Sequence, residues 1–206
     1  MDVSQLRPSC VPRLGRLLVR ESLVAANFGD TGRDDLAIGA PERDGGGQVT
    51  VMYGSGTGLS ATGSQLWSQA SPGIPGNPAA ADVFGAALAA GPFAGRPYAD
   101  LAIGVPGDGG RKGGEGPGAV NVIYGSAAGL TARGSQLWSQ SSRGVKGKPV
   151  DGEQFGSSLA AGHFAGRATA DLAVGVRAAT DARKYGGAVN ILYGSRKRLS
   201  AKVTSC

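Results

Sequence analysis

The sequence predicts an all-β fold made of three copies of a four-stranded antiparallel unit. Two observations lead to this prediction: glycine accounts for 37 of 206 residues, and one pattern of residues recurs along the chain. The glycines follow no three-residue period and separate short apolar runs, which is typical of many strands joined by tight turns. No apolar run approaches the roughly 18 residues of a membrane span, so we expect none.

The repetition is visible in several segments that keep their order. The segment DLAIGAP from Asp35 returns as DLAIGVP from Asp100 and as DLAVGVR from Asp171. Tyr-Gly-Ser occurs three times. Gln-Leu-Trp-Ser-Gln occurs twice, 71 residues apart, and Phe84-Gly85 returns as Phe155-Gly156 at the same spacing. A period of about 65 to 71 residues is too long for a helical hairpin and suits a four-stranded unit.

Each unit divides into four expected strands, which in the second copy cover 84–90, 100–105, 119–124 and 135–140. The third strand alternates most clearly, because Val120, Val122 and Tyr124 share one face. The second strand is apolar on both faces, as expected of a strand covered on both sides. Antiparallel order places connections 1–2 and 3–4 at one end of the unit and connections 2–3 and 4–1 at the other.

A sheet that is apolar on both faces has to stack on further sheets, and radial stacking gives a β-propeller of four to eight blades. Over residues 19–203, the order of Phe-Gly, Leu-Ala-Ala-Gly, Asp-Leu-Ala-Ile-Gly-Val-Pro and Val-Ile-Tyr-Gly-Ser resembles the FG-GAP repeat of integrin α-subunits and bacterial secreted proteins. The resemblance implies three β-propeller blades that are part of a seven-bladed ring. We divide the chain into a basic segment (1–18), blade one (19–81), blade two (82–152) and an incomplete blade three (153–206).

Two departures from the repeat pattern affect ring closure. Blade one has Val19 and Arg20 where later blades have Phe-Gly, and blade three has no Gln-Leu-Trp-Ser-Gln segment. Three blades cannot close a ring, so the remaining blades come from the same longer chain or from self-association, or the edges stay open. An open edge favours aggregation, so the longer chain is the preferred interpretation.

The resemblance also implies a calcium loop between the first two strands of each blade. In blade one, Asn27, Thr31, the Arg33 carbonyl and Asp35 match ligand positions, but Gly29 provides no side-chain oxygen where another ligand is needed. Calcium requires six to eight oxygens, so we expect a degenerate loop, with calcium possible in the first repeat only and no other cofactor.

The other two loops have an arginine inside the ligand pattern. Arg96 precedes Asp100, and Arg167 precedes Asp171, with the same spacing. A guanidinium group matches a carboxylate in a two-bonded pair, so each arginine is predicted to replace the cation. The alternative is two exposed arginines without a fixed partner.

Catalytic patterns are missing from the sequence. His163 is the single histidine and lies in one of the former calcium loops, and there is no Gly-x-Ser-x-Gly, phosphate-binding loop or zinc spacing. We therefore expect a non-catalytic recognition or adhesion module, outside the cell or at its surface as the resemblance implies. The alternatives are an accessory propeller of a secreted hydrolase, of the esterase or phospholipase type, and a purely structural repeat.

The net charge of +6 comes from the two ends of the chain, since the part between them sums to −1. A nucleic-acid partner is therefore not expected. Cys10 and Cys206 are expected to stay unpaired, although a disulfide between the ends is an alternative. Recognition of a protein or a glycan is expected on the varied loops 2–3 and 4–1. The candidate residues there are Arg111, Lys112, Arg143, Lys146, Lys148, Arg183, Lys184 and Tyr185.

Overall fold

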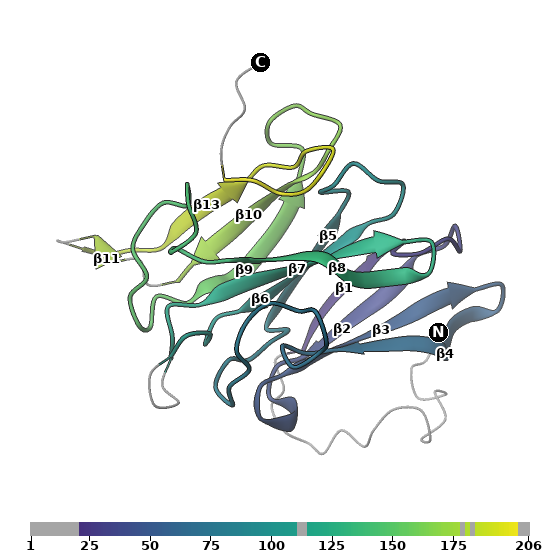
Figure 1. Ribbon diagram of the computed structural model, residues 1–206, viewed down its shortest axis with the longest axis horizontal. Helices are drawn as coiled ribbons and strands as arrows, with labels where there is room; N and C mark the ends of the chain where they lie inside the picture. The colour runs from purple at the N-terminus through teal and green to yellow at the C-terminus, as the bar shows by residue number, and fades with distance from the viewer. Residues whose placement is uncertain (1–20, 111–114, 178–179, 182–183, 202–206) are drawn as a thin grey trace.

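The computed structural model describes residues 21–110, 115–177, 180–181 and 184–201 (Figure 1). These residues form three antiparallel sheets, which lie side by side and correspond to the three sequence repeats. In the described ranges, no helix has the length and apolar character needed to cross a membrane. The all-β class is therefore confirmed. The three sheets of three or four strands are called blades one, two and three below and are described in chain order.

Blade one and blade two are four-stranded meanders in which each strand pairs with the next one in the chain. Blade one contains β1 (Ser22–Ala26), β2 (Asp35–Ala40), a 3-10 turn η2 (Arg43–Gly45), β3 (Gln48–Ser55) and β4 (Gly58–Trp67). Blade two contains β5 (Ala87–Gly91), β6 (Asp100–Val105), β7 (Ala119–Ser126) and β8 (Gly129–Trp138).

Blade three contains β9 (Phe155–Gly162), β10 (Asp171–Val176) and β13 (Ala188–Leu192), in the spatial order β9-β10-β13. A small hairpin of β11 (Thr180–Asp181) and β12 (Lys184–Tyr185) forms part of its 2–3 connection. Beyond β13, Tyr193 pairs with Ser200 in an antiparallel bridge. This bridge lies where β7 pairs with β8 in blade two, since Tyr124 there pairs with Thr131.

In blade two, the strand limits agree with the expected ones in β6. The third strand extends two residues further, to Ser126, and the first and fourth strands begin at other residues than expected. The fourth strand of blade two begins at Gly129, six residues earlier than expected, because a tight turn closes directly after β7. In that turn, the Ser126 hydroxyl donates to the Gly129 carbonyl over 2.7 Å. The first strand begins at Ala87, because Phe84 and Gly85 form a separate turn in which Gly85 has a φ of 94°.

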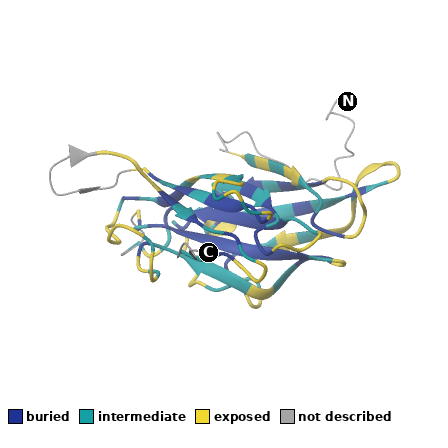
Figure 2. Cartoon of the chain, turned by 90° about the horizontal axis from the view of Figure 1, so that it is seen from above, coloured by how far each residue is buried: buried dark blue, intermediate teal, exposed yellow. Residues whose placement is uncertain are grey.

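The core lies between the blades. We call the side of a blade that packs on the preceding blade its leading face, and the opposite side its trailing face. One apolar cluster joins the trailing face of blade one to the leading face of blade two, and a second joins blades two and three in the same way. Figure 2 shows these buried residues (dark blue) in the middle of the molecule, with exposed residues at its margins.

Small residues allow the blades to approach closely. A Cβ atom on Gly39 would lie 2.2 Å from the Gly85 carbonyl oxygen, and one on Gly104 would lie 2.2 Å from the Gly156 carbonyl oxygen. The Phe-Gly turn is therefore the part of each blade that docks against the second strand of the preceding blade. The adjacent Phe84 is fully buried, and its N–H donates to the Gly46 carbonyl over 2.8 Å.

Candidate functional site

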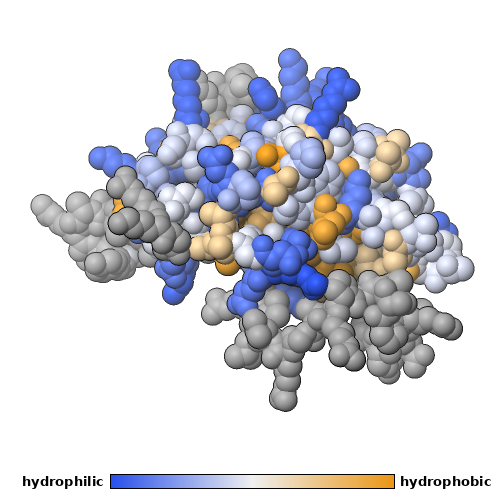
Figure 3. Space-filling view, turned by 60° about the horizontal axis from the view of Figure 1, so that its bottom comes forward, coloured by the Kyte–Doolittle hydropathy of each residue, from blue (hydrophilic) through white to orange (hydrophobic). Residues whose placement is uncertain are grey.

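The antiparallel meanders place connections 2–3 and 4–1 of all blades at one end of the molecule, which we call the loop face. In Figure 1 the loop face runs along the lower and left side, where η2 and β11 lie. Figure 3 brings the bottom of that view forward and shows apolar surface (orange) between hydrophilic side chains (blue). This is the end on which ligand recognition was predicted.

A cleft of about 570 Å³ opens on the loop face where the three blades meet. It is lined by matching positions of successive repeats, because the last residue of the DLAIGAP segment contributes from every blade. These positions are Pro41, Pro106 and Arg177. Val83 and Gln154 also line the cleft, and they directly precede Phe84-Gly85 and Phe155-Gly156. The cleft therefore depends on the stacking of the blades and on no single loop.

The backbone at the cleft adopts an unusual conformation at two equivalent positions. Val83 has a φ of 53° and Gln154 a φ of 56°, in the left-handed region that L-residues rarely adopt. For β-branched Val83 this conformation is strained, at a typical cost of about 1–3 kcal/mol. Strain of this kind concentrates at binding and catalytic sites, so it marks the cleft as a candidate site.

The side chains of the cleft carry both signs of charge. The Arg177 guanidinium donates to the Gln154 side-chain oxygen over 2.9 Å. This hydrogen bond joins the end of the second strand of blade three to the residue that precedes Phe155. Glu42 and Glu115 line the same cleft and are exposed. The arrangement can bind a ligand that presents an acceptor to Arg177 and a cationic or hydroxyl group to the glutamates.

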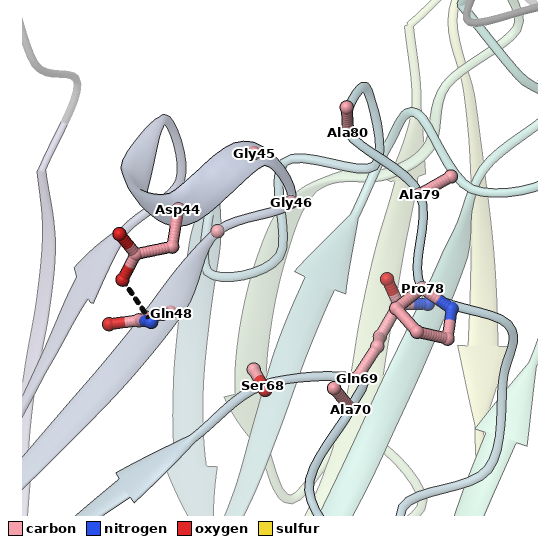
Figure 4. Close-up of a pocket in the computed structure, with 11 residues that line it drawn as sticks. Asp44, Gly45, Gly46, Gln48, Ser68, Gln69, Ala70, Pro78, Ala79 and Ala80 are labelled. Atoms are coloured by element: carbon pink, nitrogen blue, oxygen red, sulfur yellow. Dashed lines mark hydrogen bonds between the residues drawn. The ribbon is translucent and has the colours of Figure 1, made fainter.

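A second hollow of about 330 Å³ lies between η2 and the 4–1 connection of blade one (Figure 4). Its wall contains Gln48, whose side-chain amide donates to Asp44, and Gln69, which reaches toward Pro78. The Gln69 amide also donates to Asp108 over 2.8 Å, so this residue ties the loops of two blades together. Glycine and alanine residues make up much of the remaining lining, which favours a structural role for the hollow, while the buried side-chain oxygen of Gln69 accepts no hydrogen bond from the described residues.

Two acidic side chains lie under the loop face close to this tie. Burial raises the pKa of Asp82 and of Asp108 above the ordinary range, against the opposing effect of their hydrogen bonds. Asp82 accepts the Ala79 N–H over 2.6 Å, and its own carbonyl accepts the Gly107 N–H. In the next repeat Gln140, which is equivalent to Gln69, donates over 2.8 Å to Glu153, which occupies the position of Asp82.

The predicted ligand residues do not gather in the central cleft. Arg143 lines a groove beside Trp138 and Arg198, at the boundary of blades two and three. Lys146 and Lys148 are on the exposed connection between those blades, where the Lys146 N–H donates to the Asn190 side chain over 2.9 Å. Lys184 and Tyr185 form β12. Arg111, Lys112 and Arg183 lie outside the described residues, as do the basic segment 1–18 and both cysteines.

The aspartate that opens each second strand joins two turns of its blade. In blade one, Asp35 accepts the N–H groups of Phe28 and Gly54, each over 2.8 Å. Asp100 accepts those of Ala94 and Gly125, and Asp171 those of Ala165 and Gly194. All three carboxylates are buried. Each one therefore connects the 1–2 turn to the start of the 3–4 turn.

Arg96 lies with its guanidinium 5.5 Å from the centre of the Tyr124 ring, in a cation–π arrangement. Burial raises the pKa of Asp100 to about 6, and the N–H groups of Gly125 and Ala94 and the charge of Arg96 oppose this rise. The carboxylate thus takes its hydrogen bonds from the main chain, while Arg96 contributes through its charge. In blade three, the carbonyl of Arg167 contacts the His163 ring at 2.9 Å, within the turn before Asp171.

In the first loop, the residues that match calcium ligands bond to their own turn. The Asn27 side-chain oxygen accepts the Gly29 N–H, and the Thr31 hydroxyl accepts the Arg33 N–H, both over 3.3 Å. Among the described residues, no group of three or more His, Cys, Asp or Glu side chains could hold a metal ion. Calcium binding in this loop stays a prediction.

The cleft was not predicted as a unit from the sequence. Pro41, Pro106 and Arg177 were visible as equivalent positions, but only the stacking of the blades shows that they line one cavity. Neither the family models nor the curated proteins that were searched match this chain. Function therefore has to be argued from the geometry of the loop face.

Proposed function

We propose that the chain is a non-catalytic recognition module of the FG-GAP type, which binds a protein or glycan ligand in the central cleft of its loop face outside the cell or at its surface. One observation carries the proposal: Pro41, Pro106 and Arg177 line this cleft from equivalent positions of all three blades, and Val83 and Gln154 beside them have left-handed backbones. A rigid stack of sheets that presents loops at one end is a common arrangement for binding.

The chemistry of the described residues supports binding more than catalysis. His163 is engaged with the carbonyls of Arg167 and Thr169 in a turn between the first two strands of blade three. The charged groups of the cleft are Arg177, Glu42 and Glu115, a set suited to hydrogen bonds and ion pairs with a bound ligand.

Selection of ligands tests this proposal directly. The 206-residue chain is immobilised and probed with a library of displayed random peptides and with a glycan array. Ligands that bind the unmodified chain are measured again on Arg177→Ala and on Glu42→Gln. We expect the loss of a charged contact to weaken binding by at least about tenfold, which corresponds to about 1.4 kcal/mol.

Arg143→Ala is the matched control, because Arg143 is also a loop arginine but lines the outer groove. We expect it to bind the selected ligands with unchanged affinity. Failure to select any ligand, or equal binding by the Arg177→Ala and unmodified chains, would refute the cleft as the site. Hydrolysis of ester or phospholipid substrates by the chain itself would refute the non-catalytic assignment.

A further inference from the structure

The trailing face of blade three carries exposed apolar side chains at positions that are buried elsewhere in the stack. Val189 is 68% exposed and Phe164 is 55% exposed. The equivalent residues of blades one and two are fully buried, and they are Val49, Val120, Phe28 and Phe93. Phe28 and Val49 belong to the cluster between blades one and two, and Phe93 and Val120 to the cluster between blades two and three. The two internal interfaces therefore indicate what kind of surface fits Val189 and Phe164, namely the leading face of another blade.

The leading face of blade one shows the complementary exposure. Leu23 is 61% exposed and Leu59 is 45% exposed. The residues equivalent to Leu59 are Leu130 and Leu199, which are buried against the preceding blade. Within the residues that the structure describes, one trailing face and one leading face are therefore uncovered, and these are the two halves of the interface that the chain forms twice internally.

The uncovered trailing face also keeps the features that receive a following blade. In the first interface, the Ser22 hydroxyl donates to the Gly85 carbonyl over 2.6 Å, next to Gly39. Ser158 and Gly175 repeat this pair in blade three, where Ser158 is exposed. They line a groove of about 400 Å³ together with Val189.

We propose that the leading face of blade one in a second copy of this chain docks on the trailing face of blade three, in a head-to-tail arrangement. Self-association was the second source of further blades considered from the sequence, and we favour it over the longer chain here because a second copy supplies a leading face with exposed leucines, Leu23 and Leu59. The resulting ring has six blades in place of the seven that the resemblance implies. Two copies provide six blades, within the four to eight of closed propellers, whereas three copies would provide nine. A head-to-tail contact forms a ring when its rotation closes.

The mass of the chain in solution tests the proposal. One copy has a mass of 20.5 kDa, and sedimentation equilibrium over a wide concentration range should show a mass of two copies. Val189→Asp and Leu23→Asp should each raise the dissociation constant of the two-copy complex at least about tenfold, because each substitution places an unpaired charge in the apolar contact. Val150→Asp is the control, since Val150 is exposed on a connection away from both faces. Circular dichroism verifies that each variant is folded.

Mixing the two variants distinguishes a head-to-tail contact from a symmetric one. A Val189→Asp copy has an unaltered leading face, and a Leu23→Asp copy has an unaltered trailing face. An equimolar mixture should therefore form a two-copy complex through one intact contact, although each variant alone is a monomer. Absence of any complex in the mixture would refute head-to-tail docking.

A variant that is expected to bind more tightly provides an independent test of the contact. Replacing Val19 and Arg20 by Phe and Gly supplies the turn that docks in both internal interfaces, and this double variant should associate at least about tenfold more tightly. A monomer at all concentrations for both the unmodified and the double variant would overturn the proposal and favour further blades of another chain segment. A mass of three or more copies would overturn the six-bladed ring.

Discussion

At the scale of single residues, the buried aspartate of the second strand explains how a blade holds its 1–2 and 3–4 turns together. Asp100 holds the N–H groups of Ala94 and Gly125 at 2.9 and 3.0 Å. Hydrogen bonds to a charged group contribute about 1.5–3 kcal/mol each, so this contact is strong for its size. Burial of the carboxylate disfavours its charged form, so the contribution of Asp100 to the free energy of unfolding depends on pH.

The pKa of Asp100 rises from 3.8 to about 6 on folding. Because the folded state binds the proton more tightly than the unfolded state, this group stabilises the fold below pH 4. That contribution is lost as the pH rises from about 4 to about 6, and it amounts to about 3 kcal/mol. Urea unfolding of the wild type should therefore lose this free energy relative to Asp100→Asn between pH 4 and pH 7. An unchanged difference between the two proteins would contradict the raised pKa.

A tyrosine in the third strand joins neighbouring blades. The Tyr53 hydroxyl donates to the Gln65 side chain and accepts the Leu130 N–H over 3.0 Å, and the Gln65 amide donates to the Leu130 carbonyl over 3.0 Å. Burial raises the pKa of Tyr53, so the hydroxyl keeps its proton as a donor.

Tyr53→Phe should lower the free energy of unfolding by about 1–3 kcal/mol, because the Leu130 N–H loses its partner in a partly buried position. Tyr193→Phe is the matched control, since no described blade follows blade three, and it should change stability by less than about 0.5 kcal/mol. Denaturant titration followed by tryptophan fluorescence measures both. Equal losses would show that Tyr53 does not act between blades.

At the scale of elements, the second strand requires glycine where the next blade docks. Gly104→Ala would place a Cβ 2.2 Å from the Gly156 carbonyl oxygen, a main-chain atom that cannot move without separating the blades. In Gly175→Ala, the atom that the Cβ would meet, at 2.1 Å, is the Ser158 hydroxyl, which can rotate away. We expect Gly104→Ala to cost more than about 2 kcal/mol and Gly175→Ala far less in the monomer. Thermal unfolding of the two variants should separate them clearly, and similar midpoints would contradict this account.

Sequence analysis predicted elements better than contacts between them. The period of two in the third strand and the apolar second strand were sufficient to predict β6 and the shared face of Val120, Val122 and Tyr124 in β7. The role of Phe84-Gly85 was not predictable, because its partners, Gly39 and Gly46, lie on the preceding blade.

Asp100 was assigned to a calcium loop or to Arg96 because both lie close in sequence, whereas one of its main-chain partners lies 25 residues away. The cleft required the same kind of nonlocal information, since the three repeats have to stack before Pro41, Pro106 and Arg177 line one cavity. Local patterns therefore defined the strands, and long-range packing defined the candidate site.

At the scale of the whole molecule, the order of the repeats decides which residues are exposed. The valine at one position of the third strand is buried in blades one and two, as Val49 and Val120, and is exposed in blade three, as Val189. The two internal interfaces therefore form the core, and the two outer faces remain available for a further blade. This stacking also creates the cleft on the loop face, so the proposed recognition depends on it.

The free energies of unfolding of Val49→Asp, Val120→Asp and Val189→Asp, measured on dilute monomer, test the stacking most directly. An unpaired charge in either internal interface should cost more than about 4 kcal/mol or prevent folding, because Val49 and Val120 are fully buried. Val189→Asp should stay within about 0.5 kcal/mol of the unmodified chain. Equal losses in all three variants would contradict the stacking of leading face on trailing face.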